Sequence, residues 1–429
     1  MTAMKLRSAF HRFGFALLFT LATVSICAAQ SKAPEPEAPK TRIRCITAFV
    51  RLDRSQYQLQ ISEAVHFLKI AQTTFESRGF AVQTLRIATQ PFPDYTQGLS
   101  HEQTLQFFQN LDGLAQLQNV VISIGPAYLS GDDGDAQADL LAQILKNSRS
   151  LFGSVNVTGK AGVDWAAVRA AANVIKKLSD GTVHSEGNFR FAAIASVPQA
   201  TPFFPAAYLT GLGHQFAVGL ESAGEVSTAV SNAADLPSAK RRLDDLFFQL
   251  ASSVENVALR VDSERGWTYL GADLSPAPSN DASIVVAIES MSHQPLGSNG
   301  TLSAVGAITS AIKDVGLRKT GFSGVMLPVL EDPVLAERWS AGLVSLDSLL
   351  SYSSVGGTGL DTIPLPGNVT VEQLTHIIGD VATLSVKWNK PLTARLLPVS
   401  GKSAGQQTDF SDLHLLNATI QPISGTESH

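Results

Sequence analysis

Between residues 42 and 412 the sequence alternates short, almost continuous apolar runs with longer amphipathic stretches, and this alternation limits the folds open to the chain. Runs such as IRCITAFV (43–50) and VVISI (120–124) lack the polar alternation of a strand with one face in water. They therefore predict parallel strands that are covered on both faces. Strands that alternate with helices build a parallel sheet or barrel through right-handed crossovers. The predicted class is α/β.

Ten runs qualify as strands, which is more than the eight of the common α/β barrel, and an open doubly wound sheet is the alternative. The strands are predicted at 43–50, 80–87, 120–124, 151–157, 189–197, 214–220, 267–274, 322–330, 360–365 and 392–399. Helices are predicted between Ser55 and Gly79 and over 100–117, 135–145, 163–178, 236–262, 281–290, 300–315, 333–350 and 370–387. Capping-box spacing at Ser55/Gln58 and Thr370/Gln373 sets the start of the first and the last of these helices.

The first 29 residues have the pattern of a secretory signal peptide. They contain no acid, carry three basic residues, run apolar from Phe13 to Ile26, and end on small residues before Gln30. The apolar run is shorter than the roughly 20 residues that a transmembrane helix needs. We therefore expect export to the periplasm or outside the cell, with no stable membrane span after cleavage. A retained signal anchor, or a lipoprotein modified at Cys27, is the alternative.

Composition sets the domain organisation and excludes some partners. A proline-rich linker is predicted over 30–41, a single domain over 42–412 and a flexible tail over 413–429. The chain is 44% hydrophobic, enough for a large core, and its net charge of −5 gives no basic field for nucleic acid. Cleavage would leave Cys45 as the sole cysteine, which we interpret as a buried structural residue.

Several phrases resemble a family known as domain of unknown function 711, or uncharacterised protein family 0210. The phrases occur in the family's order between about residues 42 and 412. They are SVNVTGKAGVDWAAV (154–168), LGADLSPAPSND (270–281), NGTLSAVGAI (299–308), LPVLEDPVLAE (327–337), GLDTIPLPGNVTVEQLTHIIGDVA (359–382) and NKPLTARLLPVSGKSAG (389–405).

The resemblance implies a ten-stranded α/β barrel like that of pyruvate formate-lyase and ribonucleotide reductase, and a homo-oligomer that is expected to be a dimer. It implies no reaction. Radical enzymes of that fold present a cysteine on a loop inside the barrel, whereas this chain has Val355-Gly356-Gly357-Thr358 before GLD. The RLLPVSG segment (395–401) also lacks the glycyl-radical motif. No radical chemistry is therefore expected.

Asp361 and Arg395 form the first candidate pair. Asp361 stands alone among apolar residues of a predicted strand, and a buried carboxylate needs a partner or a raised pKa. Arg395, on the strand that follows the next helix, is the natural partner if the two strands are neighbours. The pair is either an acid/base with an anion clamp or a structural ion pair, and the sequence leaves both open.

Further candidates lie where strands end, since α/β folds place their sites there, and we expect all six candidates to face one opening. Asp273 is the second catalytic candidate, and Ser275, Asn156 and Lys402 are candidates for substrate contacts. Asn156 is as well explained as a turn cap, and Lys402 as a solvated lysine. The free amides that begin the helix at 370 could hold an anion together with Lys402.

Sequence motifs of familiar cofactor sites are missing. There is no HExxH and no cysteine–histidine cluster for zinc, and no GxGxxG for nicotinamide, so neither cofactor is expected, and no metal site is assigned. The sequence predicts an exported, oligomeric barrel enzyme that acts on a small carboxylated or phosphorylated compound. A non-catalytic binding or scaffold protein on the same barrel is the alternative.

Overall fold

The computed structural model describes residues 41–128 and 134–423, and residues from Lys40 onward belong to one compact unit. The predicted signal peptide and all but the last residue of the predicted linker lie outside the described residues.

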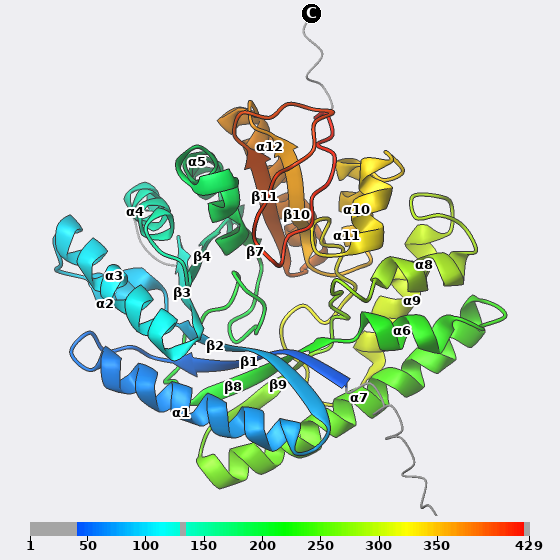
Figure 1. Ribbon diagram of the computed structural model, residues 1–429, viewed down its shortest axis with the longest axis horizontal. Helices are drawn as coiled ribbons and strands as arrows, with labels where there is room; N and C mark the ends of the chain where they lie inside the picture. The colour runs from blue at the N-terminus through cyan, green and yellow to red at the C-terminus, as the bar shows by residue number, and fades with distance from the viewer. Residues whose placement is uncertain (1–40, 129–133, 424–429) are drawn as a thin grey trace, which may run out of the picture. The chain divides into compact units, whose positions relative to one another are not determined.

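Nine strands form one mixed, mostly parallel sheet in the order β10-β11-β7-β4-β3-β2-β1-β8-β9 (Figure 1). Their bounds are β1 Thr41–Val50, β2 Phe80–Thr89, β3 Val121–Ala127, β4 Leu151–Asn156, β7 Phe191–Ala195, β8 Gln215–Glu221, β9 Thr268–Asp273, β10 Gly359–Pro366 and β11 Leu392–Val399. Nine of the ten predicted strands are thus confirmed, as is the α/β class.

The sheet consists of two groups of strands that run in opposite directions. Strands β1, β2, β3, β4 and β7 are parallel to one another. Strand β8 pairs antiparallel with β1, and β11 pairs antiparallel with β7, so that β8, β9, β10 and β11 all run the other way. The carboxyl ends of the second group therefore lie at the same edge of the sheet as the amino ends of the first.

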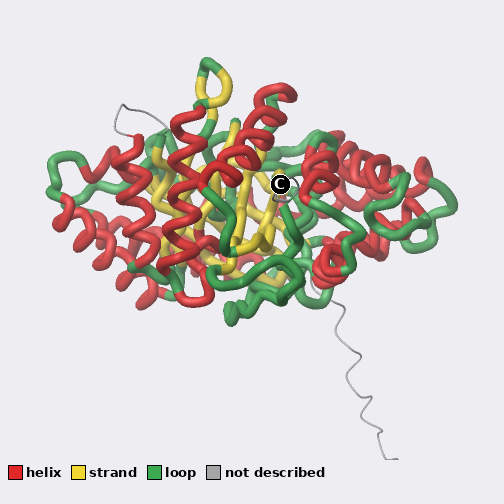
Figure 2. Tube along the Cα trace, turned by 90° about the horizontal axis from the view of Figure 1, so that it is seen from above, coloured by secondary structure: helices red, strands yellow, loops and turns green. Residues whose placement is uncertain are grey.

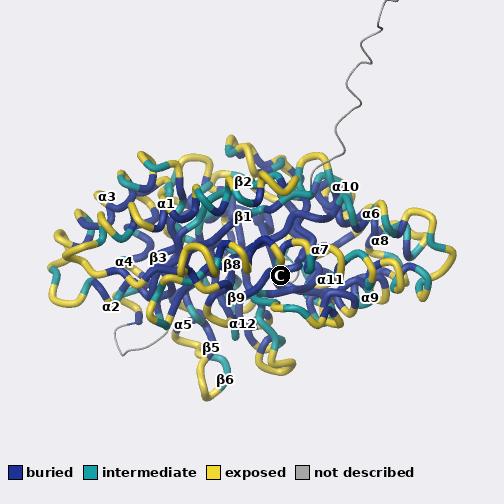
Figure 3. The backbone as a smooth tube through the Cα atoms, turned by 90° about the horizontal axis from the view of Figure 1, so that it is seen from below, coloured by how far each residue is buried: buried dark blue, intermediate teal, exposed yellow. Residues whose placement is uncertain are grey.

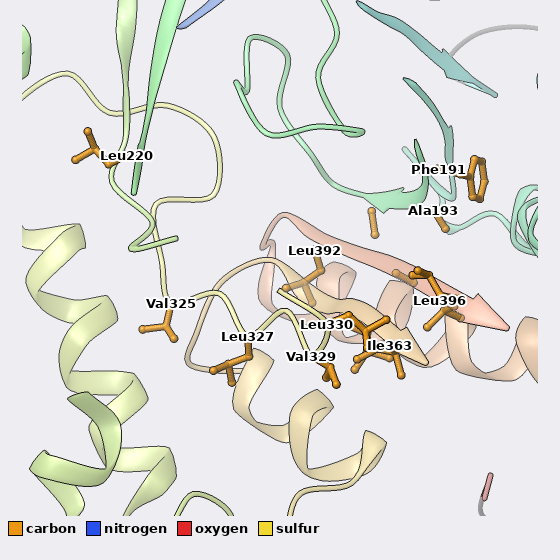
Figure 4. Close-up of a cluster of buried hydrophobic side chains, with 14 of the residues drawn as sticks. Phe191, Ala193, Leu220, Val325, Leu327, Val329, Leu330, Ile363, Leu392 and Leu396 are labelled. Carbon is orange, nitrogen blue, oxygen red and sulfur yellow. The ribbon is translucent and has the colours of Figure 1, made fainter. Parts of the chain in front are cut away.

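The predicted strand at 322–330 is wrong, because this segment is a loop with one isolated bridge at Pro328. The segment 319–329 bonds to both edge strands: Thr320 N donates to Ala272 O of β9 at 3.1 Å and Val329 N to Asp361 O of β10 at 3.0 Å. Figure 4 shows Val329 and Leu330 beside Ile363 of β10. The apolar run thus reflects burial, not strand pairing.

Helices flank the strands, which lie inside (Figure 2). They are α1 Tyr57–Glu76, α2 Phe92–Thr96, α3 His101–Gln118, α4 Gly134–Lys146, α5 Trp165–Gly181, α6 Ala223–Val230, α7 Leu236–Arg265, α8 Ile284–Ser292, α9 Thr301–Asp314, α10 Pro333–Ser340, α11 Leu346–Ser353 and α12 Val371–Trp388. A 3₁₀ helix spans Val183–Arg190, and β5 Thr158–Gly159 pairs with β6 Gly162–Val163 in a small hairpin.

Three local predictions about helices can be compared with these bounds. The capping box of Thr370 and Gln373 at α12 is confirmed. The one at Ser55 is wrong, because the Ser55 hydroxyl donates to Asp53 Oδ1 at 2.6 Å and α1 begins at Tyr57. The single helix predicted over 333–350 is two helices, α10 and α11. Gly342, with a φ of 70°, ends the turn after α10, and Ser345 caps α11.

A long connection between β7 and β8 fills the face of the sheet that the helices leave free (Figure 1). Leu209 N of this inner loop, residues 196–214, donates to Thr89 O at 2.9 Å. Its Phe204 and Ala207 pack with Phe49 and Ala217 of the sheet. The inner face is therefore a second apolar layer, and most of the backbone drawn there is buried (Figure 3).

The segment that follows residue 412 is docked as far as it is described, unlike the loose tail expected from 413. Leu416 N donates to Leu330 O at 2.7 Å, and Trp339 Nε1 to Thr419 O at 3.0 Å. Ala418 and Ile420 are buried. The apolar residues of this segment, which did not enter the prediction of a loose tail, fix it against α10 and the loop before it.

Candidate functional site: a cavity lined by arginines

A cavity of about 1080 Å³ lies on the inner face of the sheet. Its walls come from the amino ends of β1 and β2, the carboxyl ends of β8 and β9, and Arg395 of β11. Its floor includes Pro202, Phe203 and Phe204 of the inner loop. The opposed directions of the two strand groups explain why amino ends and carboxyl ends meet here.

A β-bulge in β1 turns three nearby side chains toward this cavity. The pairing with β8 shifts between Ile43 and Cys45, and Arg42, Arg44 and Cys45 all line the cavity. Regular alternation would send Arg44 and Cys45 to opposite faces, and a bulge is the usual device for re-aiming a side chain. The Cys45 thiol is buried 3.6 Å from Pro202 O. Cys45 is therefore buried as predicted, but it faces a cavity.

Arginines and carboxylates alternate along one wall of the cavity, which we call the ion-pair wall. Arg44 Nη1 lies 3.0 Å from Glu221 and its Nη2 lies 2.9 Å from Glu331, and Arg395 Nη1 lies 3.0 Å from Glu331. Arg42 adds bonds to Glu221 at 3.3 Å and to Asp281 at 2.6 Å. The complete order is Asp281, Arg42, Glu221, Arg44, Glu331, Arg395, Asp361.

Asp361 and Arg395 close the buried end of this wall, as neighbours on β10 and β11. Arg395 Nη1 donates to Asp361 Oδ1 at 2.8 Å, which confirms the pairing expected from the sequence. Asp361 is 0% exposed, and its Oδ2 has no hydrogen-bond partner. Burial raises the pKa of Asp361 to about 6, against the opposing effect of Arg395. Asp361 thus acts on the cavity only through Arg395, which lines it.

Arg86 of β2 lies in the same cavity and differs from the arginines of the ion-pair wall. Its Nε donates to Thr84 Oγ1 at 3.0 Å, and its guanidinium lies 5.1 Å from the ring centre of Phe204. Within the described parts of the chain it makes no ion pair with a carboxylate. Burial lowers the pKa of Arg86. Sequence reasoning missed this residue; the available clue was one arginine in the apolar run LRIA (85–88).

Asp273 and Ser275 line the cavity, but their hydrogen bonds hold the loop that follows Thr320. The carboxylate of Asp273 accepts from the amides of Phe322 and Ser323 at 2.9 and 3.0 Å and from Ser275 Oγ at 2.7 Å. Ser275 Oγ in turn accepts from Gly324 N at 3.2 Å. All these partners belong to one turn, so the pair fixes the cavity wall.

Asn156 and Lys402 lie away from the cavity lining. Asn156 ends β4, which runs opposite to β9, so its strand end is at the other edge of the sheet from Asp273. Its Nδ2 donates to Thr158 O at 2.8 Å, as in a turn cap. Lys402 Nζ lies 3.4 Å from Asp409. The expectation that all six candidates face one opening is wrong for these two. It fails for Asn156 because it assumed strands of one direction, whereas Lys402 follows β11 at the same edge as Asp273 but pairs with Asp409 outside the cavity lining.

Two further observations concern cofactors and membranes. Within residues 41–128 and 134–423, no group of three or more His, Cys, Asp or Glu side chains is arranged to hold a metal ion. No helix in that part of the chain is both long and apolar enough to cross a bilayer.

The sheet, its inner loop and the arginine-lined cavity define an α/β protein with a charged pocket on the inner face of its sheet. The chain belongs to the family described as Uncharacterised ACR (DUF711), whose model matches residues 37–412. A "UPF0210 protein" of Pyrobaculum islandicum is 32% identical over 353 residues, which cover 78% of each chain. A "UPF0210 protein" of Acetivibrio thermocellus is 27% identical over 389 residues, which cover 85% of this chain and 84% of the relative.

Proposed function

We propose that this protein binds a small anionic compound, carboxylated or phosphorylated, in the arginine-lined cavity and acts on it as an enzyme. The observation that carries the proposal is Arg86, a cation inside the cavity with no carboxylate partner among the described residues. An arginine removed from bulk water without an opposite charge is costly, and a bound anion supplies that charge. Guanidinium groups also match carboxylate and phosphate geometry better than lysine does.

The ion-pair wall supports this assignment by contrast. Arg44 and Arg395 each bond two acidic side chains, so their charges are already matched. Arg395, expected from the sequence to be the anion clamp, therefore fits better as part of a rigid frame around the ligand. In this proposal Arg86 contacts the anion, and Asp361 with Arg395 positions the frame.

A non-catalytic ligand-binding or scaffold role is the second candidate, and one observation favours it. Each acid that lines the middle of the cavity is already engaged: Glu221 and Glu331 accept from arginines, and Asp273 accepts from backbone amides. Asp361 has an unpartnered oxygen and a raised pKa, which suit proton transfer, but it is fully buried behind Arg395. Catalysis at Asp361 would thus need Arg395 to move.

We further propose that the fold is a ten-stranded barrel resembling that of pyruvate formate-lyase, without radical chemistry. The segment 319–329 supports this, because it bonds to both edge strands and occupies the place of a tenth strand. Export through the predicted signal peptide 1–29 and assembly into a homo-oligomer, expected to be a dimer, complete the proposal.

A thermal-shift screen with small carboxylates and phosphate compounds tests the anion site. A ligand at about 100 times its dissociation constant stabilises the fold by roughly 2.7 kcal/mol, which is measurable. We expect at least one anion to stabilise the wild type and to lose that effect in Arg86→Met. The matched control is Arg149→Met, an exposed arginine at the rim of the same cavity, which should keep the effect. The proposal is contradicted if every anion that stabilises the wild type keeps its effect in Arg86→Met.

A further inference from the structure

We infer that the compound bound at Arg86 carries a single carboxylate on an apolar body. This inference rests on the proposed function, because it assumes that the cavity binds an anion. It adds the class of anion and the character of the rest of the ligand.

The surroundings of Arg86 leave one edge of its guanidinium available. Its Nε is bonded to Thr84 Oγ1 at 3.0 Å, and the ring of Phe204 lies 5.1 Å from the guanidinium carbon on one face. The two terminal nitrogens have no partner among the described residues that would occupy them. Two donors side by side in one plane match the two oxygens of a carboxylate.

The hydrogen-bond donors left free near Arg86 favour a carboxylate over a phosphate dianion. Arg44 and Arg395, the other cations on this side, already bond Glu221, Glu331 and Asp361. Arg190, which precedes β7 and also lines the cavity, donates from both terminal nitrogens to Ser148 Oγ and to carbonyl oxygens. Among the described residues of this wall, the free pair of terminal nitrogens is thus that of Arg86, and its two donors match the two oxygens of a carboxylate more completely than the three of a phosphate.

A phosphate would find a better place at the rim. Lys146, the last residue of α4, and Arg149, in the turn that follows, line the cavity, and both residues are exposed to solvent. They lie next to the start of β4, two strands away from β2, which carries Arg86. A multiply charged anion held there would not depend on Arg86, and this dependence separates the two classes by experiment.

The cavity also has an apolar wall with uncovered surface. Val121 of β3, Phe152 of β4 and Phe203 of the inner loop are only half-buried although they lie on the inner face, and all three line the cavity. The ring of Phe152 lies 5.4 Å from that of Phe204, which in turn covers Arg86. The apolar surface thus continues directly from the anion site. An apolar ligand body would cover it and gain free energy from leaving water.

Calorimetric titration with four matched probes tests the inference. Benzoate, phenyl phosphate and benzamide share a ring and differ in charge, and acetate carries the carboxylate without the ring. We expect benzoate to bind the wild type with a dissociation constant about tenfold or more below those of benzamide and acetate. Benzamide lacks the charge-assisted bidentate contact and acetate lacks the buried ring, and each loss should cost about that factor. Arg86→Lys keeps the charge but loses the fork, and should weaken benzoate about tenfold.

The variants separate this inference from the proposal on which it rests. If phenyl phosphate binds as tightly as benzoate and loses affinity in Arg86→Met, the anion site stands and the carboxylate assignment is overturned. If acetate equals benzoate, the apolar body is overturned. If every probe binds Arg86→Met as it binds the wild type, both the inference and the proposed site fail. Circular dichroism and the melting temperature of each variant confirm that the fold is intact.

Discussion

The arginines of the ion-pair wall and Arg86 line the same cavity but have different electrostatic partners. Arg395 is 4% exposed and bonds two carboxylates and the carbonyl of Phe189, so it is bound within the fold. Arg86 has a hydroxyl and an aromatic ring for neighbours and no carboxylate partner in the described structure. The difference teaches that the pairing of a charge inside the cavity, more than its presence, separates a structural arginine from the proposed ligand-binding one. Substitutions on the two sides should therefore have opposite consequences.

The largest effect should follow from Arg395→Met, because it leaves the buried Asp361 and one bond of Glu331 without a cation. Breaking a buried ion pair from one side costs about 3–5 kcal/mol of unfolding free energy. Denaturant unfolding at neutral pH measures it. The matched control is Arg395→Met with Asp361→Leu, which removes both charges and should recover most of the loss. If Arg395→Met alone lowers the free energy of unfolding by less than about 1 kcal/mol, the ion-pair wall does not stabilise the fold as a rigid frame.

A somewhat smaller effect is expected from the titration of Asp361. Its pKa in the folded protein is raised to about 6, above that of an unfolded aspartate, so the folded state takes up a proton between these values. The stability that this group contributes is complete below the unfolded pKa and is lost as the pH rises through about 6. The stability difference between wild type and Asp361→Asn should thus fall by on the order of 1–3 kcal/mol from pH 4 to pH 7. A constant difference across this range contradicts a protonated Asp361.

The outer end of the wall should matter much less. Arg42 holds Asp281 at 2.6 Å, but the Asp281 side chain is 63% exposed. The contact with Arg42 lowers the pKa of Asp281. Exposed pairs of this kind contribute about 0.2–1 kcal/mol, and salt screens them. Asp281→Asn should cost no more than that in denaturant unfolding, and less at 1 M salt. If Asp281→Asn lowered the free energy of unfolding as much as Arg395→Met, the rigid part of the ion-pair wall would include its exposed end.

Arg86→Met should have the smallest effect on stability, within about 0.5 kcal/mol of the wild type or slightly stabilising. It removes an unmatched charge and keeps an apolar side chain of similar length over Phe204. Unfolding of the ligand-free protein measures this. A loss of several kcal/mol would place Arg86 among the structural arginines and remove the contrast between the two sides.

The sequence predicted the sheet far better than the site, and particular residues show why. Apolar runs and capping residues are local features, so nine strands and the helix that begins after Thr370 could be located from them. The pairing of Asp361 with Arg395 followed from strand order alone. The loop around Val325 was misread because burial, like strand pairing, selects apolar residues.

Strand direction and local irregularity lay beyond the sequence. Asn156 and Asp273 were expected at one opening, but β4 and β9 run in opposite directions. The bulge that turns Cys45 inward is a register shift with no residue signature of its own. Arg86 looked like any basic residue in a strand. What sets it apart is that no described residue forms an ion pair with it, and its neighbours come from distant parts of the chain.

The most direct test of the contrast is an anomalous diffraction map of crystals soaked in iodide, a monoanion whose position can be seen without knowledge of the natural ligand. One map compares Arg86, Arg44 and Arg395 in the same cavity. We predict a peak within contact distance of the terminal nitrogens of Arg86 and none at Arg44 or Arg395, whose donors face carboxylates. A cavity with peaks at the ion-pair wall and none at Arg86 would contradict the assignment of Arg86 as the anion-binding group.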